Sequence, residues 1–178
     1  MRIFIHRRKK LAGLSLLEMM IATAISALLL GTIMALSSYT ARSFAAISNY
    51  VTLDRGSRRA LDRLTMMIRE ADGVMGFETN RIGLSYHGQS LIYSYHSDSR
   101  TLTETYQGET EVLLDDCDSC SFAIFQRNTV AGTYDQYPAA LDESEAKIVQ
   151  VSWVCARHLV NNLANSESVQ SAKIVIRK

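Results

Sequence analysis

Residues 14–36 read LSLLEMMIATAISALLLGTIMAL, an uninterrupted apolar run in which Glu18 is the only charged side chain. A helix of about 20 apolar residues is long enough to cross the hydrocarbon core of a bilayer. The preceding segment, 1–13, contains five basic side chains and no acidic one. Because basic residues beside a membrane helix stay in the cytoplasm, the pattern predicts one membrane helix whose C-terminal side lies outside the cytoplasm.

A cleaved secretory signal is the alternative interpretation of this N-terminus. The apolar part of such a signal is usually about 7–15 residues long and ends at an Ala-x-Ala-like cleavage site. The run here is longer, and its Ala-Thr-Ala triplet at 22–24 lies in the middle of the run. We therefore expect the apolar segment to be retained in the protein.

Glu18 is the unusual residue of the apolar run. A carboxylate deep in a bilayer helix costs about 2.5–3.5 kcal/mol on insertion scales, so such a residue points to a function. Glu18 lies close to the start of the run, however, and a side chain at that depth can also reach the membrane surface without a further role. The residues on either side of Glu18 help to decide between a functional role and a side chain that only reaches the membrane surface.

The segment 13–18, GLSLLE, resembles the processing site of type IV prepilins and type II secretion pseudopilins. Members of that family have a short basic leader, a glycine before the cleaved bond, a large apolar residue after it, and a glutamate fifth in the mature chain. All four features occur here at the same spacing. Leu14 and Ser15 stand where the family most often has Phe and Thr, and the specific resemblance covers residues 7–36.

The resemblance implies that residues 1–13 are a leader peptide. A prepilin peptidase would cut after Gly13, and the new amino group of Leu14 would be N-methylated. Loss of the basic leader would leave the mature chain with more acidic than basic side chains. Glu18 would pair with the N-terminus of a neighbouring subunit in a filament, and this pairing would offset part of the cost of burying both charges.

Helix-favouring composition without proline continues from the apolar run to about Ala71, and the single proline of the chain is Pro138. We predict one helix from Leu14 to about Ala71, with a membrane-spanning half at 14–36 and an amphipathic half at 37–71. Apolar residues recur at helical spacing in the second half, at Phe44, Ile47, Val51, Leu61, Leu64, Ile68 and Ala71. This apolar stripe needs a cover, which we expect the C-terminal residues to supply.

Residues 72–178 carry the pattern of an antiparallel sheet. Alternating apolar and polar residues at 81–86, 91–95 and 102–106, with turns at His87-Gly88 and Gly108, predict a meander. Further strands are expected at 112–114, 122–125, 148–154 and 172–177, with loops at 127–146 and 161–171. The predicted fold is α+β, a long N-terminal helix packed on an antiparallel β-sheet, which is also the plan of pilins.

Cys117 and Cys120 form a CxxC motif in a predicted turn, and the third cysteine is Cys155. If the domain is exported, these thiols meet an oxidising compartment, and a structural disulfide between Cys117 and Cys120 is expected. Free thiols, a link to Cys155, and a redox or metal-binding role are the alternatives.

The rest of the sequence gives no sign of an enzyme. Asp115, Asp116 and Asp118 lack the spacing of a calcium loop and are interpreted as a solvated acidic turn, with calcium binding as the alternative. Histidines do not form a metal-binding motif, and phosphate-binding or nucleophile-elbow motifs do not occur. The balance of 19 basic and 18 acidic residues argues against a nucleic-acid partner. We predict no catalytic residue, no cofactor and no metal.

The segment 58–64, RRALDRL, resembles a sequence frequent in W-type minor pilins and J-type minor pseudopilins. The leading hypothesis is a structural minor pilin or pseudopilin in a type IV pilus, type II secretion or competence system of a bacterial inner membrane. Its sheet domain would lie in the periplasm, and its partners would be a prepilin peptidase and other pilins. The alternatives are a binding module at a filament tip, an adhesin or DNA-uptake subunit, and a membrane-anchored enzyme.

Overall fold

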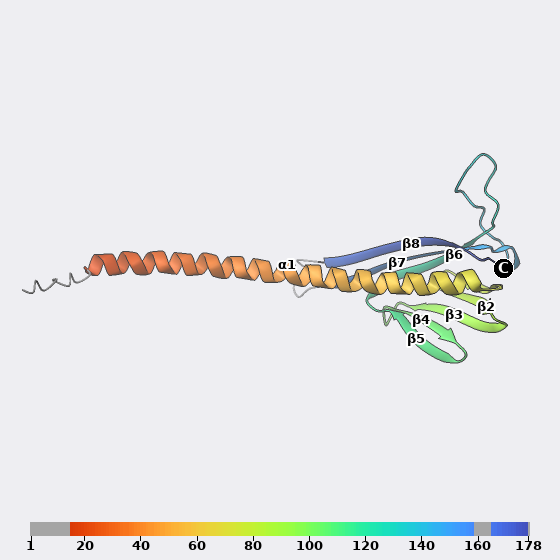
Figure 1. The fold of residues 1–178 in the computed structure, drawn as a ribbon, viewed down its shortest axis with the longest axis horizontal. Coiled ribbons are helices and arrows are strands. Elements are labelled where there is room, and N and C mark those ends of the chain that lie inside the picture. Colours follow the sequence, from red (N-terminus) through yellow and green to blue (C-terminus); the bar gives the residue numbers. More distant parts are fainter. Residues whose placement is uncertain (1–14, 159–164, 178) are drawn as a thin grey trace, which may run out of the picture. The chain divides into compact units, whose positions relative to one another are not determined.

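A computed structural model describes residues 15–158 and 165–177 of the chain. The chain separates into two compact units, Met1–Phe44 and Ala45–Lys178. Its elements, in chain order, are α1 (Leu16–Glu70), β1 (Gly73–Glu78), β2 (Arg81–Tyr86), β3 (Gln89–His96), β4 (Thr101–Tyr106), β5 (Glu109–Leu114), β6 (Cys117–Phe125), the short 3-10 helix η1 (Glu143–Glu145), β7 (Ile148–His158) and β8 (Asn165–Val175) (Figure 1).

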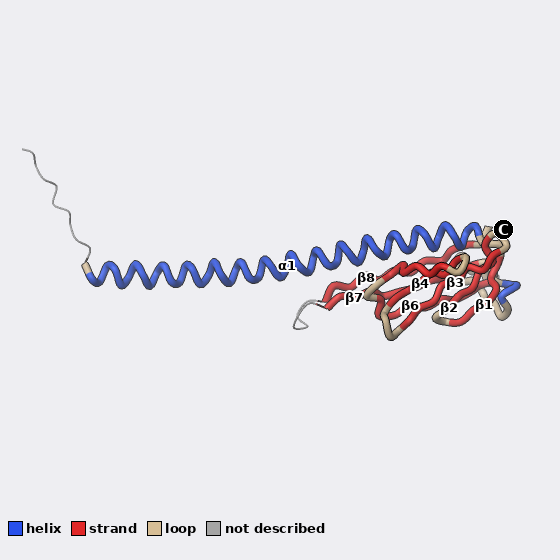
Figure 2. Tube along the Cα trace, turned by 90° about the horizontal axis from the view of Figure 1, so that it is seen from below, coloured by secondary structure: helices blue, strands red, loops and turns tan. Residues whose placement is uncertain are grey.

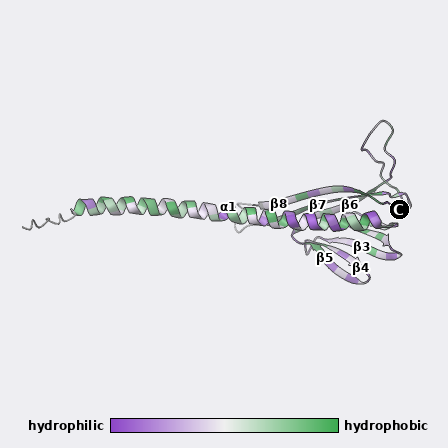
Figure 3. Cartoon of the chain, in the orientation of Figure 1, coloured by the Kyte–Doolittle hydropathy of each residue, from purple (hydrophilic) through white to green (hydrophobic). Residues whose placement is uncertain are grey.

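The helix α1 runs for 55 residues and confirms the prediction of a long N-terminal helix. Its first part is almost continuously apolar, and its last part alternates between hydrophilic and hydrophobic residues (Figure 3). Every side chain between residues 16 and 36 is exposed, whereas Leu53, Ala60, Leu64 and Ile68 are buried. The buried positions recur at helical spacing, so they form one face of the helix.

The predicted apolar stripe is only partly correct. Leu64, Ile68 and Ala71 are buried as expected, but Ile47 and Val51 are exposed, and so is Phe44. Given the helical repeat, Ile47 and Val51 lie about 110° and about 150° around the helix from the centre of the buried face. The sequence therefore carries two apolar stripes on different faces, and the sheets cover the one that begins at Leu53.

The strands form two antiparallel sheets instead of the single sheet that the sequence suggests. One sheet contains five strands in chain order, β1-β2-β3-β4-β5, and the other contains β6-β7-β8. In Figure 2 the strands of both sheets lie on the same side of the last part of α1. Buried residues from the helix and from both sheets make one continuous core, so the α+β class is confirmed.

Strand β1 is absent from the sequence prediction, in which the first strand begins at residue 81. Gly73 in fact opens the strand, and a register shift between Val74 and Gly76 interrupts its pairing with β2. Glycines weaken the strand pattern because they bring no side chain to pack and often accompany bulges. Because of Gly73 and Gly76, the edge strand β1 lacks the alternating apolar pattern by which a strand is recognised in a sequence.

The predicted loop at 161–171 is wrong from Asn165 onward, because β8 begins there and pairs with β7 along its whole length. Serines occupy the inward positions of this segment, which makes it look like a loop. Ser166 Oγ donates a hydrogen bond to the Ala46 carbonyl oxygen at 3.0 Å, and Ser168 Oγ lies 3.4 Å from Ser57 Oγ. Small hydroxyl side chains therefore face the helix at these positions.

Two hairpins close with two-residue turns. His87 and Gly88 have φ angles of 49° and 77°, and Gln107 and Gly108 have φ angles of 55° and 84°. Positive φ at both central residues defines the type I′ turn, whose twist matches that of the flanking strands. The turns expected at His87-Gly88 and Gly108 are confirmed.

Candidate functional site

The start of α1 places Glu18 in a capping box. The Ser15 N–H donates to Glu18 Oε2 at 2.8 Å, and the Glu18 N–H donates to Ser15 Oγ at 3.3 Å. A serine before the helix and a glutamate one turn later satisfy two backbone donors that otherwise lack partners. Sequence reasoning missed this role, although the Ser-x-x-Glu spacing is its usual signature. Glu18 therefore has a local function within a single chain.

The predicted peptidase site at Gly13 and Leu14 lies outside the described residues, and so does the leader at 1–13. Cleavage after Gly13 and N-methylation of Leu14 stay predictions. The described chain begins at Ser15, immediately before the helix.

Within the described residues, α1 is the one helix that is long and apolar enough to cross a membrane. In the apolar part of α1, the hydroxyl groups of Thr23, Ser26 and Thr32 are satisfied within the helix. Thr23 Oγ1 donates to the Met20 carbonyl at 2.9 Å, Ser26 Oγ to Ala22 at 2.8 Å, and Thr32 Oγ1 to Leu29 at 2.8 Å. Because hydrocarbon offers no hydrogen bonds, such internal pairing makes these hydroxyls compatible with a bilayer.

An ion pair between a buried carboxylate and a partly exposed arginine joins the helix to the five-stranded sheet. Glu104 on β4 is 2% exposed, and both its oxygens accept bonds from Arg63 on α1, with the shortest distance 2.7 Å from the Arg63 terminal nitrogen. Arg63 is also 3.2 Å from Glu111. The hydrogen bonds that Arg63 donates to Glu104 raise the pKa of the guanidinium, which stays fully charged.

The Tyr93 ring lies on β3 beside this ion pair and is fully buried. Burial raises the pKa of the Tyr93 hydroxyl, and the negative charge of Glu104 raises it further. Both effects keep the hydroxyl neutral. The sequence contains a signal for this cluster, because Glu104 lies two residues after Leu102 and therefore shares the inward face of its strand. Its partner on the helix, Arg63, is 41 residues away in the chain.

The CxxC motif lies at the start of β6 and not in a turn. Cys117 is directly opposite Cys155 on β7, and Cys120 is opposite Trp153. A register shift between Cys117 and Ser119 lets both cysteines of the motif face the core, and all three thiols are buried and free. A disulfide between Cys117 and Cys120 stays a prediction.

The cysteine thiols interact with one another. A hydrogen bond between Cys117 and Cys155 raises the pKa of the Cys117 thiol and lowers that of Cys155. Burial raises the pKa of the Cys120 thiol to about 12. Cys117 and Cys120 are therefore protonated at neutral pH, which makes a redox-active CxxC pair unfavourable because the thiolate is the nucleophile.

The acidic residues around the motif face arginines. Asp116 is 2.6 Å from Arg157 on β7, and Asp118 pairs with Arg100 at 2.5 Å. A second bond from Arg100 reaches the Ala156 carbonyl oxygen at 2.6 Å, which connects the β3–β4 turn to β7. Among the described residues, no group of three or more His, Cys, Asp or Glu side chains is arranged to hold a metal ion.

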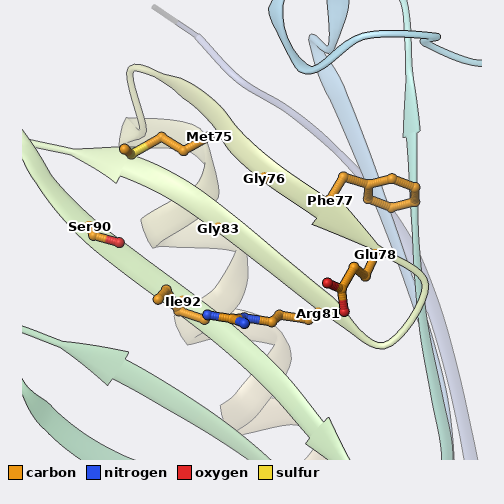
Figure 4. A pocket seen from close by; sticks show the side chains of 8 residues that line it. All are labelled: Met75, Gly76, Phe77, Glu78, Arg81, Gly83, Ser90 and Ile92. Atoms are coloured by element: carbon orange, nitrogen blue, oxygen red, sulfur yellow. The ribbon is translucent and has the colours of Figure 1, made fainter.

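A hollow of about 360 Å³ lies over strands β1, β2 and β3 (Figure 4). Gly76 and Gly83 form part of its lining, and Met75 and Phe77 extend from β1 beside them. Glu78 and Arg81 are its charged residues, and both are exposed. The arrangement offers no nucleophile activated by a neighbouring base.

Comparison of the sequence with models of protein families gives no match, and a search of curated proteins also finds none. What the described residues show is an α+β fold. It has an N-terminal helix that is long and apolar enough to cross a membrane, and antiparallel strands follow this helix.

Proposed function

We propose that this chain is a minor pilin or pseudopilin subunit that is assembled through its N-terminal helix into a type IV pilus or a type II secretion pseudopilus. The observation that carries the proposal is the acidic Glu18 in the first turn of a helix whose side chains from Met19 to Leu36 are all exposed. The capping box explains the hydrogen bonds of Glu18. It does not explain a carboxylate at the head of an apolar segment that begins after a glycine and a basic leader.

In this proposal a prepilin peptidase removes residues 1–13, and Leu14 becomes the N-methylated first residue. The helix holds the subunit in the bacterial inner membrane with the sheet domain in the periplasm. Glu18 then pairs with the amino terminus of a neighbouring subunit during assembly, and other pilins or pseudopilins surround the helix. The subunit acts by packing and requires no catalytic residue, cofactor or nucleic acid.

The second apolar stripe of the helix supports assembly. Ile47 and Val51 are exposed on the side of α1 away from the sheets. Exposed apolar residues on an otherwise amphipathic helix are favourable where another subunit covers them. The stripe thus extends the apolar contact surface beyond the predicted membrane-spanning half.

Mass spectrometry of the N-terminus tests the proposal. The full chain is produced with an active prepilin peptidase, and the intact mass and N-terminal peptide are measured. We expect a chain that begins at methylated Leu14, and no cleavage in a Gly13→Ala variant. Gly31→Ala is the matched control, because a Cβ at Gly31 meets no atom within 4 Å, and it should be processed normally. A chain that still begins at Met1 would refute the proposal.

The Glu18→Gln variant separates charge from capping. Glutamine also completes a capping box, so the helix start is retained while the negative charge is lost. We expect normal cleavage but loss of the chain from sheared filaments or from cross-linked pseudopilus complexes. Normal incorporation of Glu18→Gln would show that the charge has no role in assembly.

A binding role at a filament tip is the second candidate. Residues 127–146 contain large apolar side chains in water, with Tyr134 98% exposed and Leu141 90% exposed. Alanine at both positions should abolish adhesion or DNA uptake without affecting incorporation if this loop binds a ligand. Unchanged adhesion and uptake would leave only the structural role.

A further inference from the structure

The positions of Cys117 and Cys155 match those of a cross-strand disulfide. They are direct partners in the antiparallel pairing of β6 with β7. The Ala156 N–H donates to the Asp116 carbonyl oxygen at 2.9 Å, whereas the Cys117 N–H donates to the Arg100 carbonyl oxygen at 2.9 Å and not to Cys155. The two cysteines therefore form a non-hydrogen-bonded pair, in which side chains come closest.

Disulfide geometry fits such a pair. The Cα atoms of a non-hydrogen-bonded pair are about 4.5 Å apart. A disulfide requires a Cα separation of about 4.4–6.8 Å. Both side chains point into the core, with Cys117 0% and Cys155 1% exposed. Little backbone movement is needed to join the two sulfur atoms.

We propose that Cys117 and Cys155 form a disulfide that joins β6 to β7, and that Cys120 remains a free thiol. The electron acceptor in this reaction is an oxidant that contains a disulfide, either a small molecule or a protein. One cysteine thiolate attacks this disulfide and forms a mixed disulfide, and the other cysteine displaces the second thiol. The two cysteines lose two electrons and two protons, and the oxidant is reduced to two thiols.

The other two pairings fit less well. Cys117 and Cys120 lie on one strand, and their spacing corresponds to about 10 Å in a regular strand and somewhat less across the register shift. Cys120 is diagonal to Cys155, a relation that places residues about 7–8 Å apart. Cysteines with Cα atoms more than about 7 Å apart cannot be bridged without backbone movement.

The surroundings of Cys117 hold it in place. Tyr95 on β3 donates hydrogen bonds to the Cys117 carbonyl at 3.0 Å and the Asp118 carbonyl at 2.7 Å. The Arg157–Asp116 ion pair fixes the residue before Cys117 to β7. A disulfide at this point closes a loop from 117 to 155, which includes the long connection 127–146.

The burial of the Cys117 and Cys155 thiols determines at which stage of folding they can be oxidised. An oxidant cannot reach either sulfur in the closed domain, so the disulfide forms while the domain is folding or transiently open, and afterwards resists reductants. The inference rests on the register of β6 and β7 and holds whether or not the chain is a pilin. A test on purified protein therefore fails or succeeds independently of the proposed function.

Cysteine mapping in a glutathione buffer provides the test. The full chain in non-ionic detergent is equilibrated with oxidised and reduced glutathione at the midpoint urea concentration for unfolding, so that the core opens, and the urea is then removed. Free thiols are blocked with N-ethylmaleimide after acid quenching, and disulfide-linked peptides are identified by mass spectrometry before and after reduction. The Cys120→Ser variant is the matched control.

We expect a linked peptide pair that contains Cys117 and Cys155, with Cys120 alkylated, and the same link in Cys120→Ser. Closing a loop of this length should raise the Tm of the oxidised chain by roughly 10 °C over the reduced chain. Cys155→Ser should lose both the link and the increase. A Cys117–Cys120 link, or three alkylated cysteines after equilibration, would overturn the proposal.

Discussion

Replacement of Arg63 by methionine tests how the helix is held to the five-stranded sheet. Arg63 is the cation that faces the buried carboxylate of Glu104. Methionine keeps much of the aliphatic stem of arginine but removes the charge and the donors to both carboxylate oxygens. The Arg63→Met variant therefore leaves a carboxylate that is 2% exposed without its counter-ion.

The size of the effect follows from the burial of the two partners. Breaking a fully buried pair by removing one partner costs about 3–5 kcal/mol. Arg63 itself is 42% exposed, so water that enters from its side lowers the loss, and we expect about 2–3 kcal/mol. For a chain of this size, the loss corresponds to a decrease in Tm of roughly 5–10 °C.

Urea unfolding of the full chain in detergent measures this loss. Trp153 is the single tryptophan of the chain and is 1% exposed, so its fluorescence follows the opening of the core. Arg58→Met is the matched control, because the Arg58–Asp54 pair is exposed and solvent screens it, so its loss should change stability little. The Arg63→Met/Glu104→Met double variant should recover most of the stability, since an apolar pair replaces the unpaired charge. A double variant that is no more stable than Arg63→Met would refute the reasoning.

Two further predictions concern the core. Leu64→Ala removes a fully buried side chain between the helix and the sheets, and it should lower the free energy of unfolding by about 3 kcal/mol in the same assay. The control is Leu141→Ala, at a position 90% exposed, which should have almost no effect. A loss below about 1 kcal/mol for Leu64→Ala would contradict the packing. Stability should fall as the pH rises from about 9 toward 12, because burial raises the pKa of Cys120 to about 12, so that the unfolded chain releases this proton first. Urea midpoints measured across this pH range should fall less steeply for Cys120→Ala than for the unmodified chain, and parallel profiles would contradict the assignment.

The sequence predicts the parts of the fold that depend on local patterns. The helix is long, free of proline and apolar at helical spacing, so its predicted bounds of Leu14 and Ala71 lie close to the observed Leu16 and Glu70. The β2–β3 hairpin follows from alternation on both sides of His87-Gly88, and the structure places a type I′ turn there. In these elements, the residues that set the structure are neighbours in the chain.

The missing parts depend on pairing between distant residues. The serines at 166 and 168 suit a loop or a close approach to a helix equally well, and only pairing with β7 makes them part of a strand. Glu104 can be placed on an inward face from alternation, but its ion pair with Arg63 requires the position of the helix over the sheet. The opposition of Cys117 to Cys155 requires the register of two strands and a bulge, which no local pattern encodes.

The order of strands in the five-stranded sheet has a consequence for the growing polypeptide. Each strand pairs with the one synthesised just before it, so every hairpin of this sheet can close as soon as its second strand leaves the ribosome. The buried face of α1 is covered much later, because Trp153, which donates a hydrogen bond to Ser57 on this face, lies 96 residues further along the chain. During that interval the apolar face of the helix has no native cover from β7, and it is then most open to aggregation or to a chaperone.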